Sequence, residues 1–217
     1  MRYGLVIFDL DGTLLDTLDD LTAATNHALS LQGFPSRDRD EVRRFVGNGV
    51  VRLMRRALPG DVPEETFERA LSAFREYYAR NVNARTRPYD GIPELLAKLR
   101  AKGVRVAVNS NKPDAATNAL CEAHFGGFID MALGERDGIP KKPAPDGVRR
   151  ILDALGIAAE RALYVGDGDA DILTAENAGM DCAWVSWGFR RRDELQGLVI
   201  PRAFDKPEAL GRFILDA

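Results

Sequence analysis

The chain has 217 residues, 45% of them hydrophobic, and its 30 basic and 33 acidic residues give a formal net charge of −3. This length can bury one good core and a smaller satellite domain. The nearly balanced charge argues against nucleic acid or an anionic membrane as the main partner, so small molecules are the expected ligands. Apolar runs fall short of the roughly 18 residues of a membrane span, and the first residues lack a signal-peptide pattern, so we expect a cytoplasmic protein.

Runs of β-branched residues alternate with helical patterns along most of the chain. The predicted strands are residues 5–9, 104–109, 162–166, 182–187 and 198–200. The predicted helices between them are residues 92–102, 113–124, 145–155 and 169–178. This alternation predicts an α/β fold with a parallel, Rossmann-like sheet.

Residues 16–85 interrupt the alternation, because they contain helix patterns and no strand pattern. Helices are predicted there at residues 18–31, 40–45, 50–58 and 64–81. We therefore expect a small helical cap domain at 16–85, inserted into a discontinuous core domain formed by residues 1–15 and 86–217.

Acidic residues follow the first predicted strand. Asp9 and Asp11 are two residues apart, so they can point to the same side at the carboxyl edge of the sheet, and Gly12 permits the chain to turn. Two carboxylates 4 Å apart repel each other by about 4 kcal/mol at an effective dielectric near 20, which calls for a positive group between them. The alternative is that one aspartate caps the next turn and the other faces water.

A second acidic pair, Asp167 and Asp171, follows the strand predicted at 162–166 and is spaced by one helical turn. An EF-hand calcium loop is excluded, because the glycine and glutamate required at its sixth and twelfth positions are absent. The carboxylates of Asp9 and Asp167, with the backbone carbonyl of Asp11 nearby, are hard oxygen ligands. They favour Mg²⁺ beside a substrate phosphate.

Two further segments offer groups that can hold an anion. Ser110 supplies a hydroxyl at the end of the second predicted strand, next to a helix start whose backbone N–H groups can bind phosphate. Lys142 lies on a proline-stiffened loop before another helix. Taken alone, each segment is also compatible with an ordinary helix cap or a solvated lysine.

Together these segments match four motifs in order: D-x-D-G-T at Asp9 to Thr13, S-N-K-P from Ser110, K-P-x-P from Lys142, and G-D-x-x-x-D ending at Asp171. On these motifs the chain resembles the haloacid dehalogenase superfamily, in its phosphatase branch with a helical cap. The stretches "VGNGVVRLMRRAL", "YDGIPELLAKL" and "SWG" resemble more narrowly the phosphoglycolate phosphatases of that superfamily.

The resemblance implies a Mg²⁺-dependent phosphomonoester hydrolase in which Asp9 attacks phosphorus and forms an aspartyl phosphate. Asp11 would protonate the leaving alkoxide and later deprotonate the attacking water. The other implied site residues are Ser110, Asn111 and Lys142 for the phosphate, Asp167 with Asp9 and Asp11 for the metal, and Asp171 and Thr13 around them. The implied substrate is a small phosphorylated metabolite, with 2-phosphoglycolate leading, and the implied assembly is a monomer or homodimer.

Rival functions remain on the same scaffold. Dehalogenases lack a second aspartate in the first motif, and phosphonoacetaldehyde cleavage needs a cap lysine, which residues 16–85 do not contain. A β-phosphoglucomutase-like enzyme usually carries D-G-V where Thr13 gives D-G-T here. That mutase, a broad-specificity phosphatase of sugar phosphates, nucleotides or pyrophosphate, and a non-catalytic binding protein stay as alternatives.

Overall fold

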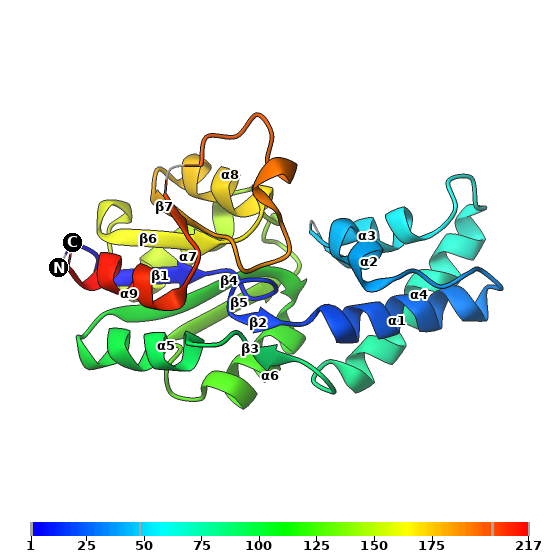
Figure 1. Ribbon diagram of the computed structural model, residues 1–217, viewed down its shortest axis with the longest axis horizontal. Helices are drawn as coiled ribbons and strands as arrows, with labels where there is room; N and C mark the ends of the chain where they lie inside the picture. Colours follow the sequence, from blue (N-terminus) through cyan, green and yellow to red (C-terminus); the bar gives the residue numbers. More distant parts are fainter. Residues whose placement is uncertain (1, 48, 201, 217) are drawn as a thin grey trace. The chain divides into compact units, whose positions relative to one another are not determined.

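The computed structural model describes residues 2–47, 49–200 and 202–216. The chain divides into two compact units, one formed by Met1–Leu15 with Pro88–Ala217 and the other by Asp16–Arg87 (Figure 1). The chain passes between them twice, through the short strands β2 (Leu15–Asp16) and β3 (Arg87–Pro88), which pair with each other.

The first unit is built on a six-stranded sheet with the order β5-β4-β1-β6-β7-β8. Its strands are β1 (Leu5–Phe8), β4 (Arg105–Pro113), β5 (Met131–Glu135), β6 (Ala162–Gly166), β7 (Asp181–Val185) and β8 (Ala203–Phe204). Neighbouring strands pair in parallel. The register sets Phe8 opposite Val108 and Val165, so β1 and β6 end at nearly the same level, whereas β4 continues beyond it to Pro113.

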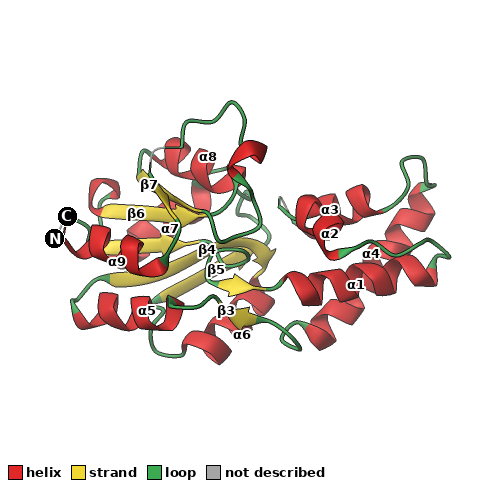
Figure 2. Cartoon of the chain, viewed as in Figure 1, coloured by secondary structure: helices red, strands yellow, loops and turns green. Residues whose placement is uncertain are grey.

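Helices cover both faces of this sheet (Figure 2). One face carries α5 (Ile92–Ala101), α6 (Asp114–Phe125) and α9 (Pro207–Asp216), and the other carries α7 (Asp146–Leu155) and α8 (Asp169–Ala178). Ile7, Tyr164 and Trp184 point toward α7 and α8 and pack there against Ile151 and Ile172. The side chains alternate between two buried faces, as expected of a doubly wound parallel sheet, which confirms the predicted α/β fold.

The largest difference between predicted and observed bounds is at β4, which was predicted to end at residue 109 and instead continues through Ser110 and Asn111 to Pro113. β6 and α8 have the predicted bounds. The strand predicted at 198–200 is wrong, because Leu198 and Ile200 pack against the core from an irregular segment and Val199 is 84% exposed. The sequence analysis did not predict β2, β3, β5, β8 or α9; β2, β3 and β8 have only two residues each, and β5 contains Gly134.

The second unit is helical. It consists of α1 (Leu18–Leu31), α2 (Arg39–Phe45), α3 (Val50–Ala57) and α4 (Glu64–Asn81), each within one residue of its predicted bounds at either end. α2 begins with a reciprocal cap, in which Asp38 accepts a hydrogen bond from the Glu41 backbone and the Glu41 carboxylate accepts one from the Asp38 backbone.

The buried carboxylate of Asp20 joins the two ends of this helical unit. It accepts hydrogen bonds from the backbone N–H groups of Arg85 and Thr86, at 3.0 Å and 2.9 Å, and from the Thr86 hydroxyl at 2.8 Å. Nearby, Asp16 pairs with Arg87 at 3.4 Å. The start of α1 and the segment that enters β3 are therefore held side by side.

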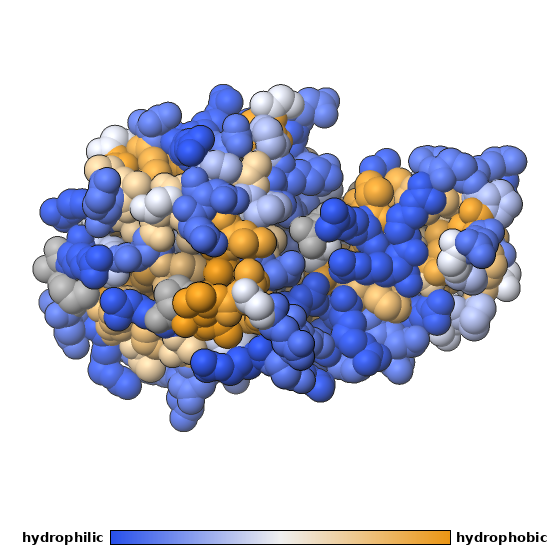
Figure 3. Space-filling view, turned by 90° about the horizontal axis from the view of Figure 1, so that it is seen from above, coloured by the Kyte–Doolittle hydropathy of each residue, from blue (hydrophilic) through white to orange (hydrophobic). Residues whose placement is uncertain are grey.

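Hydrophilic residues cover most of the face seen in Figure 3, with apolar residues gathered in patches between them. Large apolar side chains that are exposed include Leu31, Val51 and Val199. Within the described ranges, the helices are too short or too polar to cross a bilayer.

Candidate active site

The site lies where the carboxyl ends of the central strands meet. Asp9 directly follows β1, and its backbone N–H donates to the Val165 carbonyl on β6 at 2.9 Å. The chain leaves β1 and β6 toward helices on opposite faces of the sheet. Such a reversal opens a crevice at the strand ends, which is where parallel sheets bind ligands.

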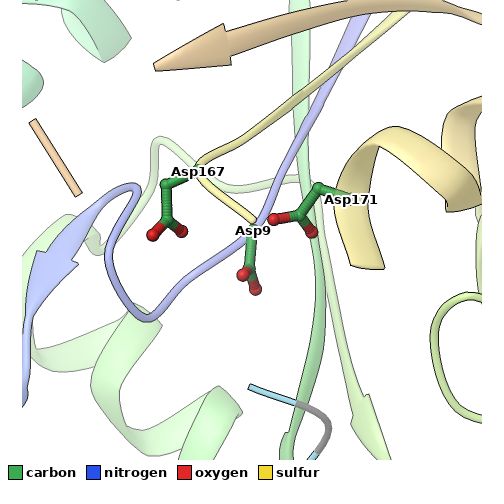
Figure 4. A group of neighbouring side chains, drawn as sticks. All are labelled: Asp9, Asp167 and Asp171. Carbon is green, nitrogen blue, oxygen red and sulfur yellow. The ribbon is translucent and has the colours of Figure 1, made fainter. Parts of the chain in front are cut away.

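Three carboxylates converge at this point (Figure 4). One ligand oxygen each from Asp9, Asp167 and Asp171 lies within 4.8 Å of the other two. Asp167 and Asp171 are buried, and the Asp9 side chain is 13% exposed. This group of hard oxygen donors could hold a metal ion. It includes Asp171, which the sequence reading had placed outside the metal ligands, whereas the carboxylate of Asp11 lies outside the group.

Asp167 is held from three directions. The Thr13 hydroxyl donates to its Oδ1 at 3.2 Å, and the backbone N–H groups of Phe189 and Arg190 donate to its Oδ2 at 2.7 Å and 3.3 Å. The indole of Trp184 donates to its backbone carbonyl at 2.7 Å. The sequence analysis placed Thr13 beside the site residues but missed the two amides, because a backbone donor carries no residue signature.

Two glycines make this close packing around Asp167 possible. Gly12 has φ +86°, and a Cβ there would lie 2.6 Å from Asp167 Oδ2. A Cβ on Gly188 would lie 2.2 Å from the Gly12 carbonyl oxygen and 2.4 Å from Asp167 Cβ. Any side chain at either position would push the turn after β1 or the loop after β7 away from the carboxylate.

Lys142 neutralises the other side of the carboxylate cluster. Its Nζ lies 2.8 Å from Asp9 Oδ1 and 2.7 Å from Asp171 Oδ1, and its side chain is 4% exposed. Asn111 accepts a hydrogen bond from the Lys142 backbone N–H at 2.9 Å and donates to its carbonyl at 3.2 Å. The ammonium is thus fixed between two aspartates by a side chain from β4.

Tyr164 supports the same cluster from the sheet below it, although the sequence reading gave it no role. Its hydroxyl lies 3.2 Å from the Asn109 carbonyl oxygen and 3.4 Å from Asp171 Oδ1. Asp171 also accepts a hydrogen bond from the Gly168 backbone N–H at 2.9 Å. These contacts fix the carboxylate that holds Lys142.

Ser110 and Asp11, the remaining two predicted site residues, are connected through Lys112. Ser110 is buried, and its Oγ accepts a hydrogen bond from the Lys112 backbone N–H at 3.2 Å. Lys112 Nζ contacts both carboxylate oxygens of Asp11, at 2.7 Å and 2.9 Å. The two acids after β1 therefore each contact a different lysine.

Burial and crowding alter the protonation of the cluster. Burial raises the pKa of Asp9 to about 8; the Lys142 ammonium opposes this shift, and the Asp171 and Asp167 carboxylates reinforce it. Burial, with Asp171 beside it, also raises the pKa of Asp167 to about 6. Burial would lower the pKa of Lys142, but the carboxylates of Asp171 and Asp9 raise it well above its ordinary value. The lysine stays charged at neutral pH.

Metal affinity is expected to rise steeply with pH. A carboxylate must be deprotonated to bind a metal, and the raised pKa values of Asp167 and Asp9 mean that metal binding releases protons between about pH 6 and 8. Calorimetric titration with Mg²⁺ or Mn²⁺ should show an association constant at least ~10-fold higher at pH 8 than at pH 6. A metal affinity that does not change between pH 6 and pH 8 would contradict this prediction. In the Asp9→Asn variant the affinity should depend much less on pH.

Comparison with known proteins places this site in a family. Residues 6–185 match the haloacid dehalogenase-like hydrolase family. Phosphoglycolate phosphatase 1 of Pseudomonas aeruginosa is 39% identical over 93% of this chain and 77% of its own length. Phosphoglycolate phosphatase of Aquifex aeolicus is 32% identical over 98% of this chain and 99% of its own length.

A solved structure shows the same fold over the whole chain. The crystal structure of a candidate phosphoglycolate phosphatase from Lactobacillus delbrueckii subsp. bulgaricus superposes with a TM-score of 0.93, at 37% identity and 100% coverage of both chains. The chain therefore belongs to the haloacid dehalogenase-like hydrolases and is a phosphatase similar to the phosphoglycolate phosphatases of that family.

Proposed function

We propose that this chain hydrolyses 2-phosphoglycolate to glycolate and phosphate through an aspartyl phosphate on Asp9. The observation that carries the proposal is the contact of Asp9 with the buried ammonium of Lys142, beside Asp167 and Asp171. An attacking carboxylate and a phosphate dianion repel each other, and this arrangement offers the positive charge and the metal ligands that offset the repulsion. The phosphoglycolate phosphatases among its relatives support the substrate.

Mg²⁺ is the metal that these donors fit best. All three side chains of the cluster offer carboxylate oxygens, and neither sulfur nor imidazole is among them. Asp9 and Asp167 would hold the ion with the Asp11 backbone carbonyl, and Asp171 would orient Lys142 and the metal's waters. When bound, Mg²⁺ supplies positive charge that offsets the charge of the phosphate and of Asp9.

The first half-reaction transfers the phosphoryl group to Asp9. The Asp9 carboxylate is preoriented, because its Oδ1 accepts hydrogen bonds from the Leu10 backbone N–H at 2.7 Å and from Lys142 at 2.8 Å. One carboxylate oxygen attacks phosphorus, the bond to the leaving oxygen breaks, and Asp11, which enters this step protonated, gives its proton to the departing alkoxide.

The second half-reaction returns the enzyme to its starting state. Asp11, now ionised, takes a proton from a water molecule that attacks the phosphorus of the aspartyl phosphate, and Asp9 leaves as a carboxylate. In both steps Ser110, the neighbouring backbone amides and Lys142 hold the transferring oxygens, where negative charge is spread over the phosphoryl group, and the Asn111 side chain keeps Lys142 in place.

The helical unit is proposed to act as the cap that excludes water from the leaving group and selects the substrate. We propose a cytoplasmic enzyme, because both cysteines, Cys121 and Cys182, are free and buried and the net charge is small. A monomer or homodimer is proposed for its assembly.

Phosphate release from a panel of monophosphates tests this function. The panel contains 2-phosphoglycolate, sugar phosphates, nucleotides and pyrophosphate, each with Mg²⁺ or with EDTA. We expect kcat/KM for 2-phosphoglycolate to exceed the others by at least ~10-fold, which takes a difference of about 1.4 kcal/mol in transition-state binding, and EDTA to abolish release. Broad, weak hydrolysis would overturn the substrate, and isomerisation of β-glucose 1-phosphate without release, or no turnover, would overturn the function.

A further inference from the structure

Lys112 forms a buried ion pair with Asp11 that the reaction described above does not use. The Lys112 side chain is 2% exposed and that of Asp11 is 17% exposed. Its Nζ lies 2.7 Å from one carboxylate oxygen of Asp11 and 2.9 Å from the other. A charge-assisted contact to both oxygens restricts the rotation of the carboxylate far more than a single hydrogen bond does.

The backbone of Lys112 is itself fixed from both sides. Its N–H donates to Ser110 Oγ at 3.2 Å, and its carbonyl lies 3.2 Å from the Thr117 hydroxyl of α6. The pairing of β4 with β5 shifts register between Asn109 and Pro113, so Lys112 lies in an irregular stretch of the strand. Irregular strand ends of this kind often redirect a side chain beside an active site.

The two buried lysines divide the two acids of the first motif between them. Lys142 contacts Asp9 and Asp171, whereas Lys112 contacts Asp11. Asp9 and Asp11 come from one turn and carry like charge, so a carboxylate without its own cation would be drawn toward the ammonium or metal that serves the other. Separate partners keep the two carboxylates in separate roles.

We propose that Lys112 is a positioning residue for Asp11, holding its carboxylate where it meets the leaving oxygen and away from the metal-binding carboxylates. This inference rests on the proposed function, in which Asp11 gives a proton to the leaving alkoxide; one carboxyl oxygen of Asp11 then carries that proton while Lys112 keeps its contact with the other oxygen. The proposed role of Lys112 is exerted through its contact with the Asp11 carboxylate.

A role through Asp11 predicts a defect that depends on the leaving group. The alkoxide of 2-phosphoglycolate needs a proton as it departs, whereas p-nitrophenyl phosphate releases a stable phenolate that does not. General acid catalysis contributes about 10²- to 10⁴-fold. We expect Lys112→Met to lower kcat for 2-phosphoglycolate at least ~100-fold with a KM within about threefold, and to slow the p-nitrophenolate burst less than about fivefold.

Three variants accompany Lys112→Met. Lys112→Arg retains the charge and the ability to contact both oxygens, so it should recover part of the lost kcat. Lys98→Met, on the exposed face of α5, removes a lysine outside the site and should behave as wild type. The double variant Asp11→Asn/Lys112→Met leaves no carboxylate without its cation. It can therefore be compared with Asp11→Asn even if Lys112→Met alone folds poorly.

The double variant also gives the sharper measurement. If Lys112 acts through Asp11, adding Lys112→Met to Asp11→Asn changes kcat for 2-phosphoglycolate less than about twofold, because the two effects are not additive. An additive loss, or an equal loss with both substrates, would overturn the positioning role. If the unmodified enzyme is active and Lys112→Met is equally active, this inference alone is overturned. If the unmodified enzyme releases no phosphate, or if Asp9→Asn remains active, the proposed function is overturned.

Discussion

Asp9→Asn is expected to reduce phosphate release by at least about 10⁴-fold, because the variant removes the nucleophile that carries the phosphoryl group. The amide keeps the shape of the side chain and can still accept the hydrogen bond of the Leu10 backbone N–H. Steady-state release from 2-phosphoglycolate and trapping of a phosphorylated enzyme measure the loss. Asp153→Asn, at an exposed position of α7, is the matched control and should retain full activity.

The same variant should stabilise the metal-free protein. Burial raises the pKa of Asp9 to about 8, above its value of 3.8 in the unfolded chain, so the folded state binds more protons and loses stability as pH rises from about 4 to 8. Removing this group should raise the free energy of unfolding by on the order of 1–2 kcal/mol at pH 8.5 in EDTA, and less at pH 5. Urea unfolding at the two pH values measures this change. If Asp9→Asn instead lowers the free energy of unfolding at pH 8.5, the contact of Asp9 with Lys142 stabilises the fold by more than the burial of Asp9 destabilises it.

Lys142→Met is expected to damage stability and catalysis together. The ammonium is 4% exposed and is bonded to both Asp9 and Asp171, so its removal leaves two buried carboxylates facing each other without compensation. Breaking a buried pair from one side costs about 3–5 kcal/mol, and loss of a charge that faces the transferring oxygens costs about 10²- to 10³-fold in kcat. Thermal unfolding in EDTA and phosphate release with Mg²⁺ measure the two effects.

Two further variants separate the two effects of Lys142. Lys141→Met removes the neighbouring lysine, whose side chain is 37% exposed, and its ion pair with Glu135 should contribute less than about 1 kcal/mol. Adding Asp171→Asn to Lys142→Met removes one unpaired carboxylate, so stability should recover in part while kcat stays low. Unchanged unfolding and turnover in Lys142→Met would contradict the charge balance described for this site.

The sequence was sufficient to predict β1, β6 and α8, which position Asp9, Asp167 and Asp171, but it ended β4 before Ser110 and Asn111, which lie within that strand. The run ending at Asp9 and the run ending at Gly166 each combine β-branched residues with a polar strand end, and the helix at 169–178 stops at a glycine. The structure places Asp9 and Asp167 at neighbouring strand ends because β1 pairs with β6. Strand order itself was not predictable from the pattern, since it depends on which runs pair.

The features of the site that could not be predicted from the sequence depend on contacts that form only when the chain folds. Lys112 stood in a recognised motif, yet its partner Asp11 is 101 residues away and no local spacing connects them. Tyr164 had the pattern of an ordinary buried strand residue, because its hydroxyl finds Asp171 only after α8 packs on the sheet. The amides of Phe189 and Arg190 are equally invisible, since any residue provides a backbone N–H.

The contact between Asp20 and residues 85 and 86 has a consequence for how this architecture can diversify. Because the helical segment begins and ends at the same place, its exchange for a longer, shorter or unrelated segment would leave the sheet's own connections nearly unchanged. Under the proposed role of the helical unit in substrate selection, chemistry and selectivity are carried by separable segments of one chain. Remodelling the insertion would then change the substrate while the strand ends that carry Asp9 and Asp167 stay as they are.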